Sequence, residues 1–170
     1  MLFFVYFREQ IIKGMWLTFH GEPVRQDIRD VVMDRTLSLR GEGREIKICI
    51  GTDSQKIGDA TRFATALVFV VKGNGGFMYV RKRRDLTPYA LRERMMLEIA
   101  YSIETAYEIE PVIRKLGLEM EIHADINKNP KFPSHASYNE AMGYIKSMGY
   151  TFVSKPDAFA ASGCADIFCH

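Results

Sequence analysis

The hydrophobic and polar positions in the first half of the chain predict a helix followed by three strands. Apolar side chains recur at helical spacing in residues 23–36, and an apolar strand follows at 48–53, written ICIGTD. Two β-rich runs lie within residues 61–84, separated by the turn sequence GNGG at 73–76. An Asn-Gly turn between two such runs predicts an antiparallel hairpin.

Helices and strands alternate in the second half of the chain. Thr87 and Pro88 predict the start of a long helix that runs to about Leu116, and Pro111 is expected to kink or restart it. The later elements are predicted to be a strand at 118–126, a helix at 136–148, a strand at 150–154 and a short helix within 157–169. This order predicts a mixed α/β sheet with helices on its faces.

The amino-terminal residues stand apart from this order. Segment 1–23 begins with apolar and aromatic residues, but Arg8 and Lys13 interrupt it well before the roughly 20 residues of a membrane span. It lacks the basic leader and small-residue cleavage site of a secretory signal. We interpret it as an extension or an edge element, with Met15 as an alternative start, and residues 24–170 as a single domain.

Composition narrows the class of protein. The 170 residues are 47% hydrophobic and 26% charged, as in an ordinary globular protein, and the net charge of +2 is too small to identify a polyanionic partner. Cys49, Cys164 and Cys169 form no CxxC pair, and the last two do not have the spacing of a zinc site with His170. Reduced thiols and a cytoplasmic location are expected.

Three carboxylates follow the predicted elements in a way that points to a metal site. Asp53 ends the strand ICIGTD, Asp125 comes near the end of a later strand, and Glu98 interrupts the apolar stripe of the long helix. Ligands gather beyond the carboxyl ends of parallel strands, so neighbouring strands would bring the two aspartates to one sheet edge. Converging carboxylates repel one another unless a divalent cation binds them, and oxygen ligands suit Mg²⁺ or Mn²⁺.

Each carboxylate also has a plainer interpretation. Asp53 is expected to cap a turn if it acts alone, and Asp125 is placed to form an Asx-turn before Asn127. Glu98 becomes a surface charge if the helix is phased differently. The residues by themselves leave these alternatives open.

Three motifs carry a resemblance to a known family. The runs GTDSQ at 51–55, HADIN at 123–127 and KPDAFAASGCADIFC at 155–169 closely resemble the YkuK-type family of ribonuclease H-like proteins. The resemblance covers roughly residues 24–170. It implies a five-stranded sheet whose first three strands are antiparallel and whose fourth and fifth are parallel to the first, with helices on both faces. It also implies two-metal cleavage of nucleic acid.

Carried over to this chain, the resemblance implies a catalytic ligand set for two Mg²⁺ or Mn²⁺ ions. Asp53 would bridge the ions, Glu98 and Asp125 would be further ligands, and Asp166 would be the late ligand. Asp157 is the alternative fourth ligand, because it directly follows the last predicted strand. On one continuous helix it would lie about 180° and roughly 13 Å away from Asp166, so both could not bind the same ion. We favour Asp166, because the small residues before it let a helix approach the metal edge, and we interpret Asp157 as a helix cap.

Other polar residues near these motifs are candidates for substrate contact. His135 is either a proton shuttle or a structural histidine at a helix entry. The run at 81–84 is either a track for phosphates or a solvated edge of the sheet. The predicted nucleic-acid-binding residues are Ser54, Gln55, Arg81, Lys82, Arg83, Arg84, Asn127, Lys128 and Lys131.

The predicted function is that of a metal-dependent nuclease, a hydrolase acting on RNA, DNA or an RNA–DNA hybrid. Two alternatives remain: a non-catalytic nucleic-acid-binding module of the same fold, and a phosphoesterase acting on small nucleotides. An actin-like ATPase would need a second GTD-like half, and no GxxxxGK[ST] phosphate loop occurs. No membrane contact and no small-molecule cofactor are expected.

Overall fold

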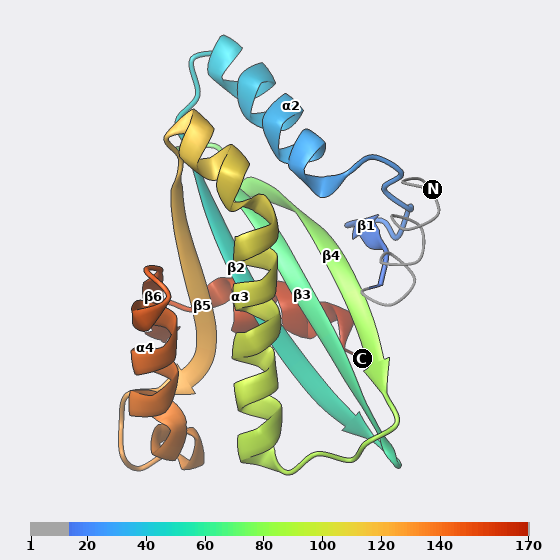
Figure 1. Cartoon of the computed structure of the whole chain (residues 1–170), viewed down its shortest axis with the longest axis vertical. Helices are drawn as coiled ribbons and strands as arrows, with labels where there is room; N and C mark the ends of the chain where they lie inside the picture. Colours follow the sequence, from blue (N-terminus) through green and yellow to red (C-terminus); the bar gives the residue numbers. More distant parts are fainter. Residues whose placement is uncertain (1–13, 170) are drawn as a thin grey trace.

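The computed structural model of the protein describes residues 14–169, whose sheet is built around a meander of three long strands (Figure 1). β2 (Ile46–Ile57) pairs antiparallel with β3 (Ala60–Val71), which in turn pairs antiparallel with β4 (Gly76–Asp85). In the turn between β3 and β4, Gly73 and Gly75 have φ values of 78° and 73°, a backbone conformation that glycine adopts at little cost. The predicted hairpin is confirmed.

Three further strands complete the sheet. β5 (Glu119–Asn127) pairs parallel with β2, and β6 (Thr151–Lys155) pairs parallel with β5. The short β1 (Trp16–Thr18) pairs antiparallel with β4, which gives the order β1-β4-β3-β2-β5-β6. The mixed α/β class is confirmed, while the predicted five strands become six because β1 adds an edge strand.

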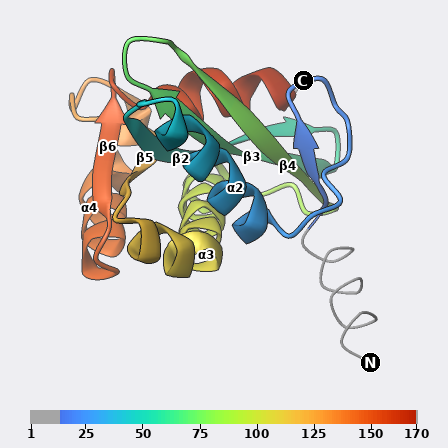
Figure 2. The same cartoon turned by 90° about the horizontal axis from the view of Figure 1, so that it is seen from above.

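Helices cover the two faces of the sheet unequally (Figure 2). α2 (Ile28–Gly41), α3 (Leu91–Leu116) and α4 (Tyr138–Ser147), the last preceded by the 3₁₀ turn η1 (Pro133–Ser137), form one layer. The C-terminal segment lies on the opposite face as a π-helix, η2 (Ala160–Ala165), followed by a 3₁₀ turn, η3 (Asp166–Phe168). We call these the α3 face and the C-terminal face.

Alternation along the strands assigns side chains to these faces. Ile48 and Ile50 of β2 join the main core beneath α3, whereas Cys49 joins a second cluster with Ala160 and Ala165 of the C-terminal segment. Because side chains alternate along a strand, Asp53 shares the face of Cys49.

Two predicted boundaries and the predicted type of the last helix are wrong. β2 does not end at Asp53 but continues to Ile57, because its last residues pair with the start of β3. α3 begins at Leu91 rather than near Thr87, since the Glu93 side chain accepts a hydrogen bond from the Ala90 amide at 2.9 Å. The last helix is π-helical and 3₁₀ rather than α-helical, so the α-helical spacing assumed for Asp157 and Asp166 does not apply.

Two remaining features of α3 bear on its prediction. Pro111 lies inside the helix without ending it, and Gly117 stops the helix with a φ of 57°.

Within residues 14–169, no helix combines the length and apolar character needed to cross a membrane. The predictions for residues 1–13 and His170 concern positions outside the described part of the chain.

Candidate metal centre

Asp53 lies on the C-terminal face of β2, opposite Ala64 of β3. Its side chain is half-buried, and Asp166 of the C-terminal segment is close enough to interact with it. Burial raises the pKa of the Asp53 carboxyl to about 6; the Ser54 backbone amide opposes this rise, and the neighbouring Asp166 carboxyl adds to it. Asp53 is therefore held where its charge lacks full compensation.

Glu98 reaches the same region from α3. Glu98 is half-buried, and its carboxyl accepts a hydrogen bond from the Ser54 hydroxyl at 2.5 Å. Burial raises the pKa of Glu98 to about 8, the Ser54 hydrogen bond lowers it, and the negative charge of Asp53 raises it further. The interruption of the helical stripe thus corresponds to a carboxyl group turned toward β2.

The third member of the group is Asp166, and the nearby Cys169 thiol responds to the charges of all three carboxylates. The Cys169 thiol donates to the Asp53 carbonyl oxygen at 3.2 Å. Burial raises the pKa of this thiol to about 12, and the charges of Asp53, Glu98 and Asp166 contribute to the increase. Carboxylates from a strand, a helix and the C-terminal segment therefore influence one another electrostatically, although their oxygen atoms do not all lie within 4.8 Å of one another.

Asp157 does not share this position. It is exposed, and its charge acts on His123 rather than on Asp53. The helical segment after it begins without a side-chain cap, so Asp157 does not serve as the predicted cap. Of the two candidates for the fourth ligand, Asp166 is the one beside Asp53.

The chain brings Asp166 to the sheet through close backbone packing. A Cβ atom at Gly51 would clash with the backbone of Ala160 and Ala161, so only glycine allows η2 to lie this near to β2. His123 fixes the same segment, since its Nδ1 accepts a hydrogen bond from the Ala160 amide at 3.3 Å. The closest backbone approach is at Ala160 and Ala161, whereas an added Cβ at Gly163, within the small residues predicted to permit it, has nothing within 4 Å.

Asp125 has a different environment from the other three carboxylates. The pairing between β2 and β5 extends to Gly51 and His123, and continuing that register by two residues would place Asp125 beside Asp53. The Asp125 carboxylate instead forms an ion pair with Lys155 of β6 at 2.5 Å. Its role as a metal ligand therefore remains a prediction that requires release from Lys155.

Among residues 14–169, three potential metal ligands with donor atoms all within 4.8 Å of one another occur at Cys49, Glu121 and His123. These side chains already form hydrogen bonds with one another and with neighbouring residues. Glu121 contacts Lys47 at 3.1 Å and His123 Nε2 at 3.1 Å, and burial raises the pKa of the Cys49 thiol to about 12. We interpret this group as a structural hydrogen-bond network beneath η2.

The carboxylate group fits a hard divalent cation better. Asp53, Glu98 and Asp166 offer oxygen donors, which suit Mg²⁺ and Mn²⁺, and two of them have pKa values raised by burial and mutual repulsion. A bound cation would remove that repulsion.

Only part of the predicted nucleic-acid surface is available to a ligand. Arg81 is 1% exposed and pairs with Glu108 at 2.8 Å, so its predicted phosphate contact is wrong. Arg83 pairs with Glu104 at 2.7 Å but lines an open pocket, so its phosphate contact stays a prediction. Ser54 is buried against Glu98 and does not face a ligand either. Lys82, Arg84, Lys128 and Lys131 are exposed, and Gln55 is partly exposed.

Two further predicted residues have local structural roles. The Asn127 side chain accepts a hydrogen bond from the Asn129 amide at 3.0 Å, which places the Asx-turn at Asn127 rather than at Asp125. His135 stacks on Tyr138 with an interplanar angle of 10°. Its role as a proton shuttle remains a prediction.

Sequence reasoning missed Arg94. Its guanidinium donates to the Ser54 carbonyl oxygen at 3.0 Å, and its charge lowers the pKa values of both Asp53 and Glu98. Arg94 lies one helical turn before Glu98, and this i, i+4 spacing was the available signal.

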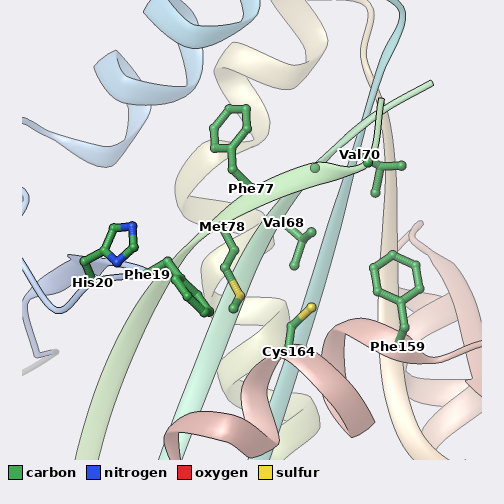
Figure 3. A pocket seen from close by; sticks show the side chains of 10 residues that line it. Phe19, His20, Val68, Val70, Phe77, Met78, Phe159 and Cys164 are labelled. Atoms are coloured by element: carbon green, nitrogen blue, oxygen red, sulfur yellow. The ribbon is translucent and has the colours of Figure 1, made fainter. Parts of the chain in front are cut away.

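An apolar groove lies away from the carboxylates (Figure 3). It has a volume of about 620 Å³, and Val68 and Met78 point from β3 and β4 toward Cys164 of η2. Its lining is almost entirely apolar and contains no carboxylate, so we do not assign metal binding to this groove.

Comparison with known proteins identifies the family of the chain. The sequence profile described as Ribonuclease H-like matches residues 27–170. The chain belongs to the ribonuclease H-like family. It is 35% identical over 135 residues to the "Uncharacterized protein YkuK" of Bacillus subtilis (strain 168), a match that covers 71% of this chain and 77% of that protein. This relative confirms the YkuK-type resemblance within the ribonuclease H-like family, and no solved structure shows a significant match.

Proposed function

We propose that this ribonuclease H-like protein is a nuclease that hydrolyses phosphodiester bonds of RNA or DNA with Mg²⁺ or Mn²⁺. The observation that carries the proposal is the convergence of Asp53, Glu98 and Asp166 with raised pKa values for the first two. Carboxylates without compensating charges destabilise the fold when they are buried together. Groups with such raised pKa values are found most often at functional sites. The free thiols of all three cysteines suit a cytoplasmic enzyme.

Asp53, Glu98 and Asp166 would hold the metal, with Asp125 as a further ligand once it leaves Lys155. Two such ions, when bound, supply an activated water and stabilise the oxygen that leaves the phosphorus. The chain itself orients the ligands. Ser54 directs Glu98 through its hydroxyl, and Arg94 holds Ser54 through its carbonyl oxygen.

One observation favours a second candidate, a nucleic-acid-binding module without turnover. The ion pair between Asp125 and Lys155 occupies a carboxylate that the two-metal arrangement would use. If this pair persists when nucleic acid is bound, the protein would bind its ligand without cleaving it.

Cleavage of end-labelled RNA, DNA and RNA–DNA hybrid with Mg²⁺ or Mn²⁺ tests the proposal. We expect Asp53→Asn and Asp166→Asn to lower the cleavage rate at least about 100-fold, because each removes a charge from the metal site. Asp157→Asn, at an exposed position of the same C-terminal region, is the matched control and should cleave at the wild-type rate. Folded wild-type protein that cleaves none of the three substrates would contradict the nuclease proposal.

A further inference from the structure

The cations of β4 divide between the two faces of the sheet. On the α3 face, Arg81 and Arg83 are paired with Glu108 and Glu104. On the C-terminal face, Lys82 and Arg84 are exposed, and no ion pair joins either to a carboxylate of residues 14–169. The same strand therefore neutralises its cations on one face and leaves them available on the other.

A third cation joins this exposed pair from the neighbouring strand. Arg62 of β3 is exposed and lies directly opposite Arg84 in the register between β3 and β4. Arg62, Lys82 and Arg84 line a pocket of about 260 Å³ together with Phe168, and Phe63 and Arg83 complete its lining. The Lys82 ammonium lies 5.2 Å from the centre of the Phe168 ring, a contact that favours a defined position for this side chain.

This basic pocket lies on the same face as Asp53, at a defined distance from it. Asp53 is opposite Ala64, and Ala64 is opposite Lys82, so two strand spacings separate Asp53 from Lys82. At about 4.8 Å for each spacing, the two backbones are roughly 10 Å apart. Like charges opposite one another destabilise a sheet, so cations gathered here without counter-charges are suited to an anionic ligand.

We propose that Arg62, Lys82 and Arg84 form a subsite for backbone phosphates of a nucleic-acid strand. The phosphodiester bond of this strand that is hydrolysed lies at Asp53. The position of that bond rests on the proposed nuclease function. Phosphates of a stacked strand advance by about 3.4 Å each, so a separation of roughly 10 Å corresponds to about three nucleotides. A polynucleotide, with its regularly repeated phosphates, can occupy the Asp53 site and the basic pocket at the same time. A small nucleotide is too short to do so, which favours a polynucleotide substrate.

Binding measured without metal tests the subsite separately from catalysis. The full chain in EDTA is titrated into a fluorescein-labelled 12-nucleotide RNA or DNA strand at several KCl concentrations, and fluorescence anisotropy gives Kd. Lys82→Ala/Arg84→Ala should raise Kd about tenfold or more and reduce the slope of log K against log[KCl] by about 1.4 to 1.8, because this variant neutralises two fewer phosphates. Arg62→Ala should reduce the slope by about half as much.

Two controls make the result specific. Lys146→Ala removes an exposed cation from α4 on the opposite face and should leave Kd and the salt slope unchanged. A labelled dinucleotide carries a single backbone phosphate, so the double variant should reduce its salt slope by no more than about half of the reduction seen with the 12-nucleotide strand. Circular dichroism checks that each variant is folded.

The outcomes separate this proposal from the nuclease proposal. An unchanged salt slope in the double variant overturns the subsite, even if the wild type cleaves nucleic acid. A reduced slope in a protein that cleaves nothing supports the subsite and contradicts the nuclease.

Discussion

At the scale of single residues, Asp53 and Glu98 are carboxyl groups in surroundings that disfavour their charged forms. Burial is the largest cause for each, and Arg94 offsets only part of it. With pKa values of about 6 and 8, protons occupy both groups over much of the range in which a free carboxylate would be charged. A cation that replaced these protons would gain strongly favourable electrostatic interactions.

These raised pKa values predict how stability depends on pH. The folded state binds more protons than the unfolded state between about pH 4 and pH 8, so the free energy of unfolding of the metal-free protein should fall as pH rises. The fall should amount to a few kcal/mol, because one pKa unit corresponds to about 1.4 kcal/mol. Glu98→Gln keeps an acceptor for the Ser54 hydroxyl and removes the larger shift, so its stability should depend less on pH.

Urea denaturation in EDTA at pH 5, 6, 7 and 8 measures this difference. Glu119→Gln, which changes an exposed glutamate at the start of β5, should follow the wild-type profile. Parallel profiles for wild type and Glu98→Gln would show that the Glu98 carboxyl titrates normally.

At the scale of elements, the position of Asp166 depends on how the C-terminal segment packs against β2 and β5. Gly51 allows the backbones to approach, and the His123 ring accepts the Ala160 amide while its other nitrogen contacts Glu121 at 3.1 Å. Burial lowers the pKa of His123, which favours the neutral ring that such an acceptor requires. The network at Cys49, Glu121 and His123 therefore supports the segment that carries Asp166 and does not belong to the proposed metal centre.

Gly51→Ala should displace the C-terminal segment. The new methyl group would clash with backbone atoms of Ala160 and Ala161, which cannot rotate away. We expect a loss of about 1–3 kcal/mol in stability, typical of overpacking, together with a cleavage defect comparable to that of Asp166→Asn. Thermal unfolding and the cleavage assay measure the two effects.

Gly143→Ala is the matched control for this substitution. Gly143 lies in α4 with nothing within 4 Å of its added Cβ, so alanine should stabilise the helix by up to about 1 kcal/mol and leave cleavage unchanged. A Gly51→Ala variant with wild-type stability and cleavage would mean that the segment tolerates the methyl group.

At the scale of the whole molecule, the carboxylates come from all three layers of the fold. Asp53 lies on the central sheet, Glu98 comes from the α3 layer and Asp166 from the C-terminal layer. A cation bound by all three would link layers that otherwise meet mainly through apolar contacts. Metal binding should therefore stabilise the folded chain as a unit.

Periodicity and turn signals predicted the order of elements, but side-chain pairing could not be predicted in the same way. The hairpin, the parallel strands and the convergence of Asp53 with Asp166 follow from local patterns and the family resemblance. The burial of Arg81 depends on strand register and on the distant Glu108, and the pairing of Asp125 depends on Lys155 of the last strand. The residues adjacent in sequence to Arg81 or Asp125 do not show that Glu108 or Lys155 lies beside them in the fold.

The last prediction concerns the whole chain with added metal. Saturating Mn²⁺ at about 100 times its Kd should stabilise the fold by about 2.7 kcal/mol, which raises Tm by roughly 5–10 °C for a chain of this size. At one fixed Mn²⁺ concentration the shift should be larger at pH 8 than at pH 6, because metal binding must displace the protons held by Asp53 and Glu98 and the Kd is therefore higher at pH 6. Asp53→Asn should lose most of the shift, whereas Asp157→Asn should keep it. An equal shift in both variants would place the ion elsewhere, since only the first changes a carboxylate of the proposed centre.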